Sequence, residues 1–98
     1  MTALIDLLNE EKNILNHIDA FVSMLNYQES FLETLVSKGP QTEYTQYNIK
    51  VARLEIGKNT EKLEKYKRDL AECRNKILEY FQSIASYSVT LNINRKGE

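Results

Sequence analysis

The chain has 98 residues, of which 42% are hydrophobic and 28% are charged, and its formal net charge at pH 7 is −1. A charge so close to zero argues against general binding to polyanions, and this hydrophobic content argues against disorder throughout. The length allows one domain, residues 1–98. A domain this small is near the lower limit at which one core offsets chain entropy, so oligomerisation is a common support.

The single cysteine, Cys73, excludes an intramolecular disulfide and favours a reducing compartment. The chain has no run of 18 apolar residues, and its first residues lack the basic charges that begin a signal peptide. We therefore expect a cytoplasmic protein, of a cell or of an infected host, that has no membrane partner.

Apolar residues at heptad spacing predict a first helix over about 2–37. These seam residues are Leu4, Leu7, Ile14, Ile18, Phe21, Leu25, Leu32 and Leu35. Further apolar residues beside the seam are Leu8, Leu15, Val22 and Val36. A face of this breadth is typical of a helix that packs on more than one neighbour. We expect a turn over 38–41, because Gly39 readily adopts a left-handed conformation and Pro40 cannot continue a helix.

A second heptad pattern predicts a helix over about 42–85, capped by Thr42. Its seam residues are Ile49, Ala52, Ile56, Leu63, Tyr66, Leu70, Cys73, Ile77, Tyr80, Ile84 and Tyr87. The pattern holds register through Gly57, which predicts one continuous helix; a break there would give three helices instead. Asn59 is the clearly polar residue of this seam, and it either sets the register or marks a kink or a solvated edge.

Folding back at Gly39-Pro40 predicts an all-α fold, a long antiparallel helical hairpin that resembles a coiled coil. Charge favours this pairing, since residues 1–37 carry a net charge of −5 and residues 38–98 carry +4. In such a hairpin the numbers of facing residues add to about 79. Glu11 then lies level with Lys67 and Arg68, and the second helix from Tyr80 onward extends past the first.

Residues 86–94 alternate between polar and apolar side chains, which predicts a strand-like C-terminal extension over 86–98. A lone strand leaves its backbone groups unpaired, so it must pair with a copy of itself or with a partner, or else fray. We expect a homo-oligomer, a dimer or higher. Its predicted interface residues are Tyr80, Phe81, Ile84, Tyr87, Val89 and Leu91.

A second apolar surface is predicted near the turn, on both helices and away from the seam. Its residues are Tyr27, Phe31, Tyr44, Tyr47 and Val51. Exposed aromatic surface of this kind favours binding of a protein partner. The alternative is that a three-helix fold, broken at Gly57, covers these residues within the chain.

The basic cluster of Lys58, Lys62 and Lys65 is a candidate anion contact. Acidic residues interleave with it and no aromatic platform accompanies it, which argues against a nucleic-acid partner. His17 is the only histidine, and the chain has neither a glycine-rich phosphate loop nor a Glu-x-x-His pair. We therefore predict neither catalysis, nor a cofactor, nor a metal site.

Together these features predict a non-enzymatic protein-interaction module that acts as a homo-oligomer, such as a small inhibitor, an adaptor or a chaperone-like protein. In size and architecture the chain is similar to small phage-encoded inhibitors and to bacterial chaperones or adaptors. The alternative is an oligomer that binds or sequesters a nucleotide-like ligand in pockets between protomers. A nucleic-acid binder ranks third.

Overall fold

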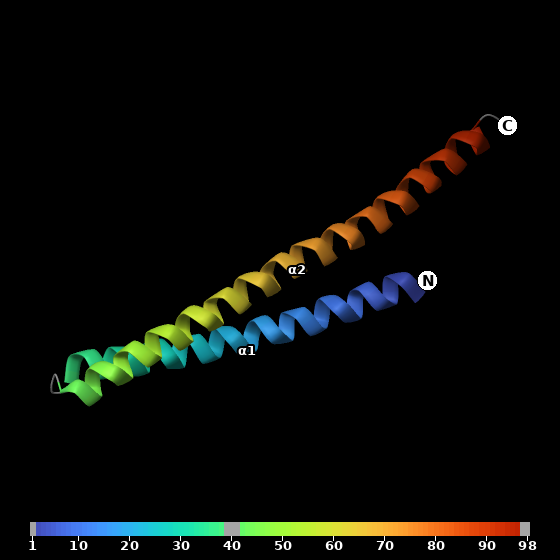
Figure 1. Cartoon of the computed structure of the whole chain (residues 1–98). Coiled ribbons are helices and arrows are strands. Elements are labelled where there is room, and N and C mark those ends of the chain that lie inside the picture. The colour runs from blue at the N-terminus through green and yellow to red at the C-terminus, as the bar shows by residue number, and fades with distance from the viewer. Residues whose placement is uncertain (1, 39–41, 97–98) are drawn as a thin grey trace.

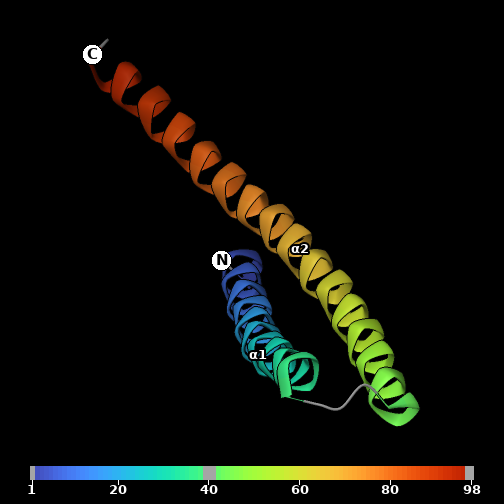
Figure 2. The ribbon, with the colours of Figure 1, turned by 90° about the vertical axis from the view of Figure 1, so that its left-hand side faces the viewer.

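The computed structural model describes the backbone of residues 2–38 and 42–96 and the side chains of residues 3–37 and 42–85. Two helices make up this part of the chain, α1 (Thr2–Lys38) and α2 (Glu43–Lys96). From the turn end, α2 runs back alongside α1 and continues past its N-terminus (Figures 1 and 2). The molecule is elongated, with extents of 84 × 21 × 14 Å. The predicted all-α class is confirmed.

The sequence accounts for the unbroken length of α1 and for the residue at which α2 begins. The 37 residues of α1 contain neither glycine nor proline, so nothing interrupts the helix. At the start of α2, the backbone N–H of Thr45 donates to the Thr42 hydroxyl at 3.1 Å, and the N–H of Gln46 donates to the Thr42 carbonyl at 3.0 Å. Thr42 is therefore the N-cap of α2, as predicted. The predicted turn residues Gly39 and Pro40 lie outside the described residues.

The core lies along the line where the two helices meet. Its buried apolar residues are Ile14, Leu25, Ile49, Leu63 and Cys73. All five occupy heptad positions, so the seam that the apolar spacing predicts is the face that each helix buries. Across this seam the His17 ring stacks on Tyr66, with ring centroids 4.9 Å apart, and Phe21 contacts the same tyrosine at 5.5 Å.

Contacts between the helices run in opposite order along the chain. The Cys73 thiol donates to the Leu7 carbonyl at 3.3 Å, near the N-terminus of α1, whereas Asn59 contacts Gln28, nearer the turn. The prediction for Glu11 was wrong: its carboxylate accepts from Arg74 Nε at 3.1 Å, not from Lys67 or Arg68. The fold-back is centred slightly later than Gly39-Pro40, which moves the partners of α1 further along α2.

The predicted strand-like extension is also wrong, because α2 remains helical through residues 86–94 and ends at Lys96. The described part of the chain contains no strand with which such a segment could pair. A helix satisfies its backbone N–H and C=O groups within itself, and this outweighs the β-type alternation of the sequence.

Gly57 does not break α2, which contradicts the three-helix alternative. A methyl group added to Gly57 would meet no atom within 4 Å. Replacing Gly57 with alanine should therefore raise the free energy of unfolding by about 0.5–1 kcal/mol, because glycine loses more backbone entropy in a helix. Urea denaturation followed by circular dichroism would measure the change. The exposed Ala71→Gly change on the same helix should shift stability in the opposite direction by a similar amount.

Candidate functional site

A groove between the helices near the turn brings together residues from both of them. We call it the tip groove. It has a volume of about 400 Å³ and is lined by Tyr27, Gln28, Phe31, Tyr44, Asn48, Val51, Ala52 and Glu55. Four of the five residues predicted for partner binding are in this lining. Only Glu55 in the lining carries a formal charge, so the groove offers mainly apolar and amide surface.

Helical spacing explains why these side chains share one side of the hairpin. Tyr27 and Phe31 are four residues apart on α1, and Tyr44 and Val51 are seven apart on α2, so each pair lies on one helix face. The two faces adjoin on the same side of the seam. Tyr27 is 73% exposed and Tyr44 is 75% exposed. The rings therefore present their surfaces outward and do not enclose a cavity.

Tyr47 is the predicted binding residue that is not in the tip-groove lining. It is 64% exposed, nearly as much as Tyr44. Because it lies three residues after Tyr44, its side chain is rotated by about 60° around the helix axis. Tyr47 thus resembles Tyr44 in chemistry and exposure and differs in position, which makes it a natural control.

A second groove lies at the same end of the molecule and is lined by Val36, Gln46, Ile49, Lys50, Arg53 and Leu54. Its volume of about 550 Å³ is larger than that of the tip groove. It contains no aromatic side chain, and long polar chains make up half of its lining. Aromatic anchors dominate binding energy at protein interfaces, so we regard the tip groove as the stronger candidate.

The three lysines of the predicted anion contact lie around one shallow hollow on α2, together with Glu61 and Arg68. Within this set, Lys58 also lies 3.8 Å from Glu55 on the preceding turn, and both side chains are largely exposed. Exposed pairs of this kind contribute little to stability. The hollow gathers basic groups but contains a carboxylate and no aromatic ring, which is a weak arrangement for a nucleotide or a nucleic acid.

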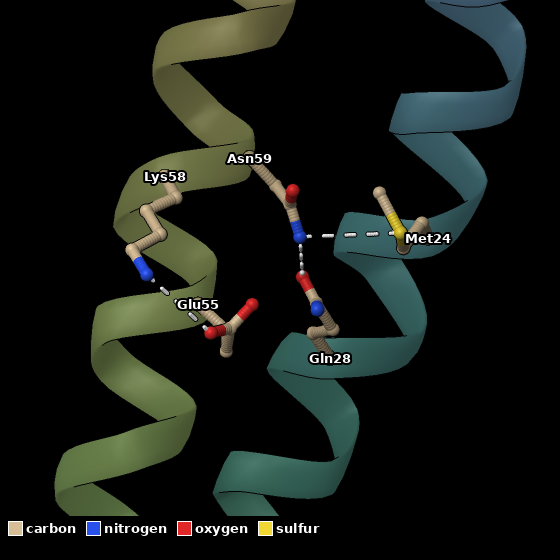
Figure 3. A network of polar contacts seen from close by, with 5 residues as sticks. All are labelled: Met24, Gln28, Glu55, Lys58 and Asn59. Carbon is tan, nitrogen blue, oxygen red and sulfur yellow. Dashed lines mark hydrogen bonds and ion pairs between the residues drawn. The ribbon is translucent and has the colours of Figure 1, made fainter.

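A polar pair next to the tip groove joins the two helices (Figure 3). The side chain of Asn59 is 7% exposed, and its amide nitrogen donates to Gln28 Oε1 at 3.0 Å and lies 3.9 Å from the Met24 sulfur. Asn59 is therefore a buried, bonded seam residue and does not mark a solvated edge. Because Gln28 also lines the groove, this pair fixes one groove residue against the opposite helix.

Sequence reasoning missed Gln28 as both the partner of Asn59 and a groove residue. The signal was present, because Gln28 sits at seam spacing between Leu25 and Leu32, where an apolar residue is expected. The assumed fold-back placed Asn59 level with residue 20 and so concealed the match. Ala52 was expected on the seam and also lines the groove, whereas Asn48 and Glu55 carried no comparable signal.

At the other end of the molecule, α2 continues past the start of α1 (Figure 1). We call residues 80–96 the overhang. Tyr80 is half-buried, whereas Phe81 and Ile84 are 51% and 46% exposed. The Tyr80 and Phe81 rings meet edge to face at 6.1 Å. The side chains of the other predicted interface residues, Tyr87, Val89 and Leu91, lie outside the described set.

Cys73 is the titratable group whose environment is most clearly altered. Its side chain is 2% exposed. Burial raises the pKa of the Cys73 thiol above its usual value, and the carboxylates of Glu10 and Glu11 raise it further. A raised pKa keeps the thiol protonated at neutral pH, so Cys73 should react slowly with alkylating reagents.

Among the described residues, no group of three or more His, Cys, Asp or Glu side chains is placed to hold a metal ion. No helix in the described part of the chain is long and apolar enough to cross a membrane. Comparisons of the chain with protein-family models, with curated proteins and with solved structures find no match.

Proposed function

We propose that this chain is a non-enzymatic protein-interaction module that acts as a homo-oligomer and binds a partner protein through the tip groove. The observation that carries the proposal is the convergence of Tyr27, Phe31, Tyr44 and Val51, from two helices, around one solvent-exposed groove. Aromatic side chains exposed in this way lose little conformational entropy on binding and gain a large apolar contact.

The chemistry of the groove favours a protein partner over the other candidates. A nucleic acid would require several cations along its phosphates, and the charged residue of this lining is Glu55. A small ligand is best bound where walls enclose it, whereas Tyr27 and Tyr44 face solvent. An apolar helix face or a loop carrying aliphatic side chains fits an aromatic groove with amide groups at its edge.

The test uses peptides of defined sequence as probes. Helical peptides would be selected from a displayed random library on the wild-type protein, and their affinities measured by fluorescence anisotropy. Tyr44→Ser should weaken binding by about tenfold or more, equivalent to about 1.4 kcal/mol, because it removes an anchor of the groove. Tyr47 is similarly exposed but lies outside the lining, so Tyr47→Ser should change the affinity by less than about twofold.

Two outcomes would count against this function. Selected peptides that bind both serine variants as tightly as the wild type would place the recognition surface elsewhere. Saturable binding of ATP that is lost in Lys62→Ala would instead favour the nucleotide-binding alternative, with the basic hollow as its site. Tyr44→Ser and Tyr47→Ser change exposed residues, so the melting midpoint of each variant should remain within a few degrees of that of the wild type.

A further inference from the structure

The seam of α2 continues beyond the helix that covers it. Leu63, Leu70, Ile77 and Ile84 recur at intervals of seven residues, so they lie on one face of α2. Leu63 is buried against α1, whereas Ile84, beyond the start of α1, is 46% exposed. In the sequence Leu91 holds the next position at this spacing. Any segment that covers the overhang must therefore lie in line with α1.

The overhang also differs from the rest of the chain in charge. The chain contains 27 charged residues, yet none lies between Glu79 and Arg95. A solvated helix face normally carries charges, and these keep it apart from copies of itself. The uncharged stretch 80–94 lacks that repulsion, and the two charges of the overhang, Arg95 and Lys96, lie at its end. By contrast, α1 is acidic and would repel a second α1, so the overhang is the part of the molecule best suited to meet its own copy.

We propose that the overhang is covered by the overhang of a second copy, in an end-to-end dimer with two-fold symmetry. This inference rests on the homo-oligomeric part of the proposed function. The partner's overhang runs antiparallel to α2 and occupies the line that α1 leaves empty. A two-fold axis makes the contact reciprocal, so one arrangement covers both exposed seams and leaves no open end.

The helix lengths fit this arrangement. Pairing the overhangs over their length brings the C-terminal end of the partner's α2 next to the N-terminus of α1, which begins at Thr2. α2 ends in Arg95 and Lys96, and α1 carries Asp6, Glu10 and Glu11 near its start, so this junction brings segments of opposite charge together. Deeper overlap would drive the partner's helix into α1, and shallower overlap would leave seam residues exposed.

The first test is the mass of the full chain by light scattering at tens of micromolar. We expect twice the 11.4 kDa of one chain. Ile84→Asp should return the mass to that of one chain and raise the dissociation constant by about 100-fold or more, because it buries an unpaired charge twice per dimer. Gln82→Asp is the matched control, since it adds the same charge on the opposite side of the same turn and should remain dimeric.

The second test is a distance between spin labels attached at Gln82→Cys. Cys73 is 2% exposed and should not compete for the label, and labelling of the wild type checks this. The end-to-end arrangement predicts about 25 Å between the labels, from the helical rise and the spacing of packed helices. Parallel overhangs would give about 15 Å, and hairpins overlapping along their whole length about 40 Å.

Each outcome decides the proposal. A monomeric wild type, a dimer that survives Ile84→Asp, or a label distance near 15 or 40 Å would overturn it. A monomeric wild type would mean that a different protein, and not a second copy of this chain, covers the overhang. The proposed function fails separately: Ile84→Asp should leave peptide affinity at the tip groove unchanged, and Tyr44→Ser should leave the mass unchanged.

Discussion

Replacing Leu25 with alanine should lower the free energy of unfolding by about 2–5 kcal/mol, through lost apolar burial and the cavity left behind. Leu25 is 7% exposed at the centre of the α1 seam. The free energy of unfolding of a small domain is about 5–15 kcal/mol in total, so this single change removes a large part of it. Urea denaturation followed by circular dichroism, at one protein concentration, would measure it.

Leu54→Ala provides the matched comparison, because this leucine is 58% exposed and makes no part of the buried seam. Its cost should stay below about 1 kcal/mol. Equal costs at the two positions would contradict the assignment of the seam as the core. They would indicate that an assembly buries the side of α2 that carries Leu54.

Ending the chain after Glu79 should abolish association while leaving the pairing of α1 with α2 in place. The truncation removes the overhang but keeps Cys73, Arg74 and every interhelical contact described above. The melting midpoint of an associating protein rises with its concentration by mass action, whereas that of a monomer does not. We therefore expect a concentration-dependent midpoint for the full chain, and a lower, constant midpoint for the truncated chain.

This comparison separates two roles of the overhang. A truncated chain that no longer folds at any concentration would show that the segment is needed for the hairpin itself. A midpoint independent of concentration in the full chain would show that the overhang does not associate. Melting curves followed by circular dichroism at 222 nm, across a hundredfold range of protein concentration, would distinguish these two outcomes.

The helices and their buried face could be predicted because heptad spacing reports directly on burial. Leu25, Leu63 and Cys73 were expected on the seam, and all three are buried. The end of α2 could not be predicted from side-chain pattern alone. Residues 86–94 carry β-type alternation, but a strand needs a partner for its backbone, and this requirement lies outside any local pattern.

The tip groove was accessible to sequence reasoning only in part. Tyr27, Phe31, Tyr44 and Val51 follow from helical geometry, because their spacing places them on adjoining faces. The register between the helices is set by many weak contacts and by the length of the turn. An error of a few residues in that register was enough to hide the bond between Gln28 and Asn59 and to assign Glu11 to the wrong partner.

The bond between Asn59 and Gln28 also constrains the alignment of the two helices, on which the shape of the tip groove depends. Sliding one helix along the other by a heptad would shift it by about 10 Å and still match apolar seam to apolar seam. Asn59 would then face Phe21 or Leu35 in place of an amide, at a cost of about 1–3 kcal/mol for an unsatisfied buried group. Such a slipped molecule would have a normal helical spectrum, yet its Tyr27 and Phe31 would no longer stand opposite Tyr44 and Val51. Helical content alone would therefore not report whether the tip groove is assembled, and the Asn59–Gln28 bond favours the alignment that assembles it.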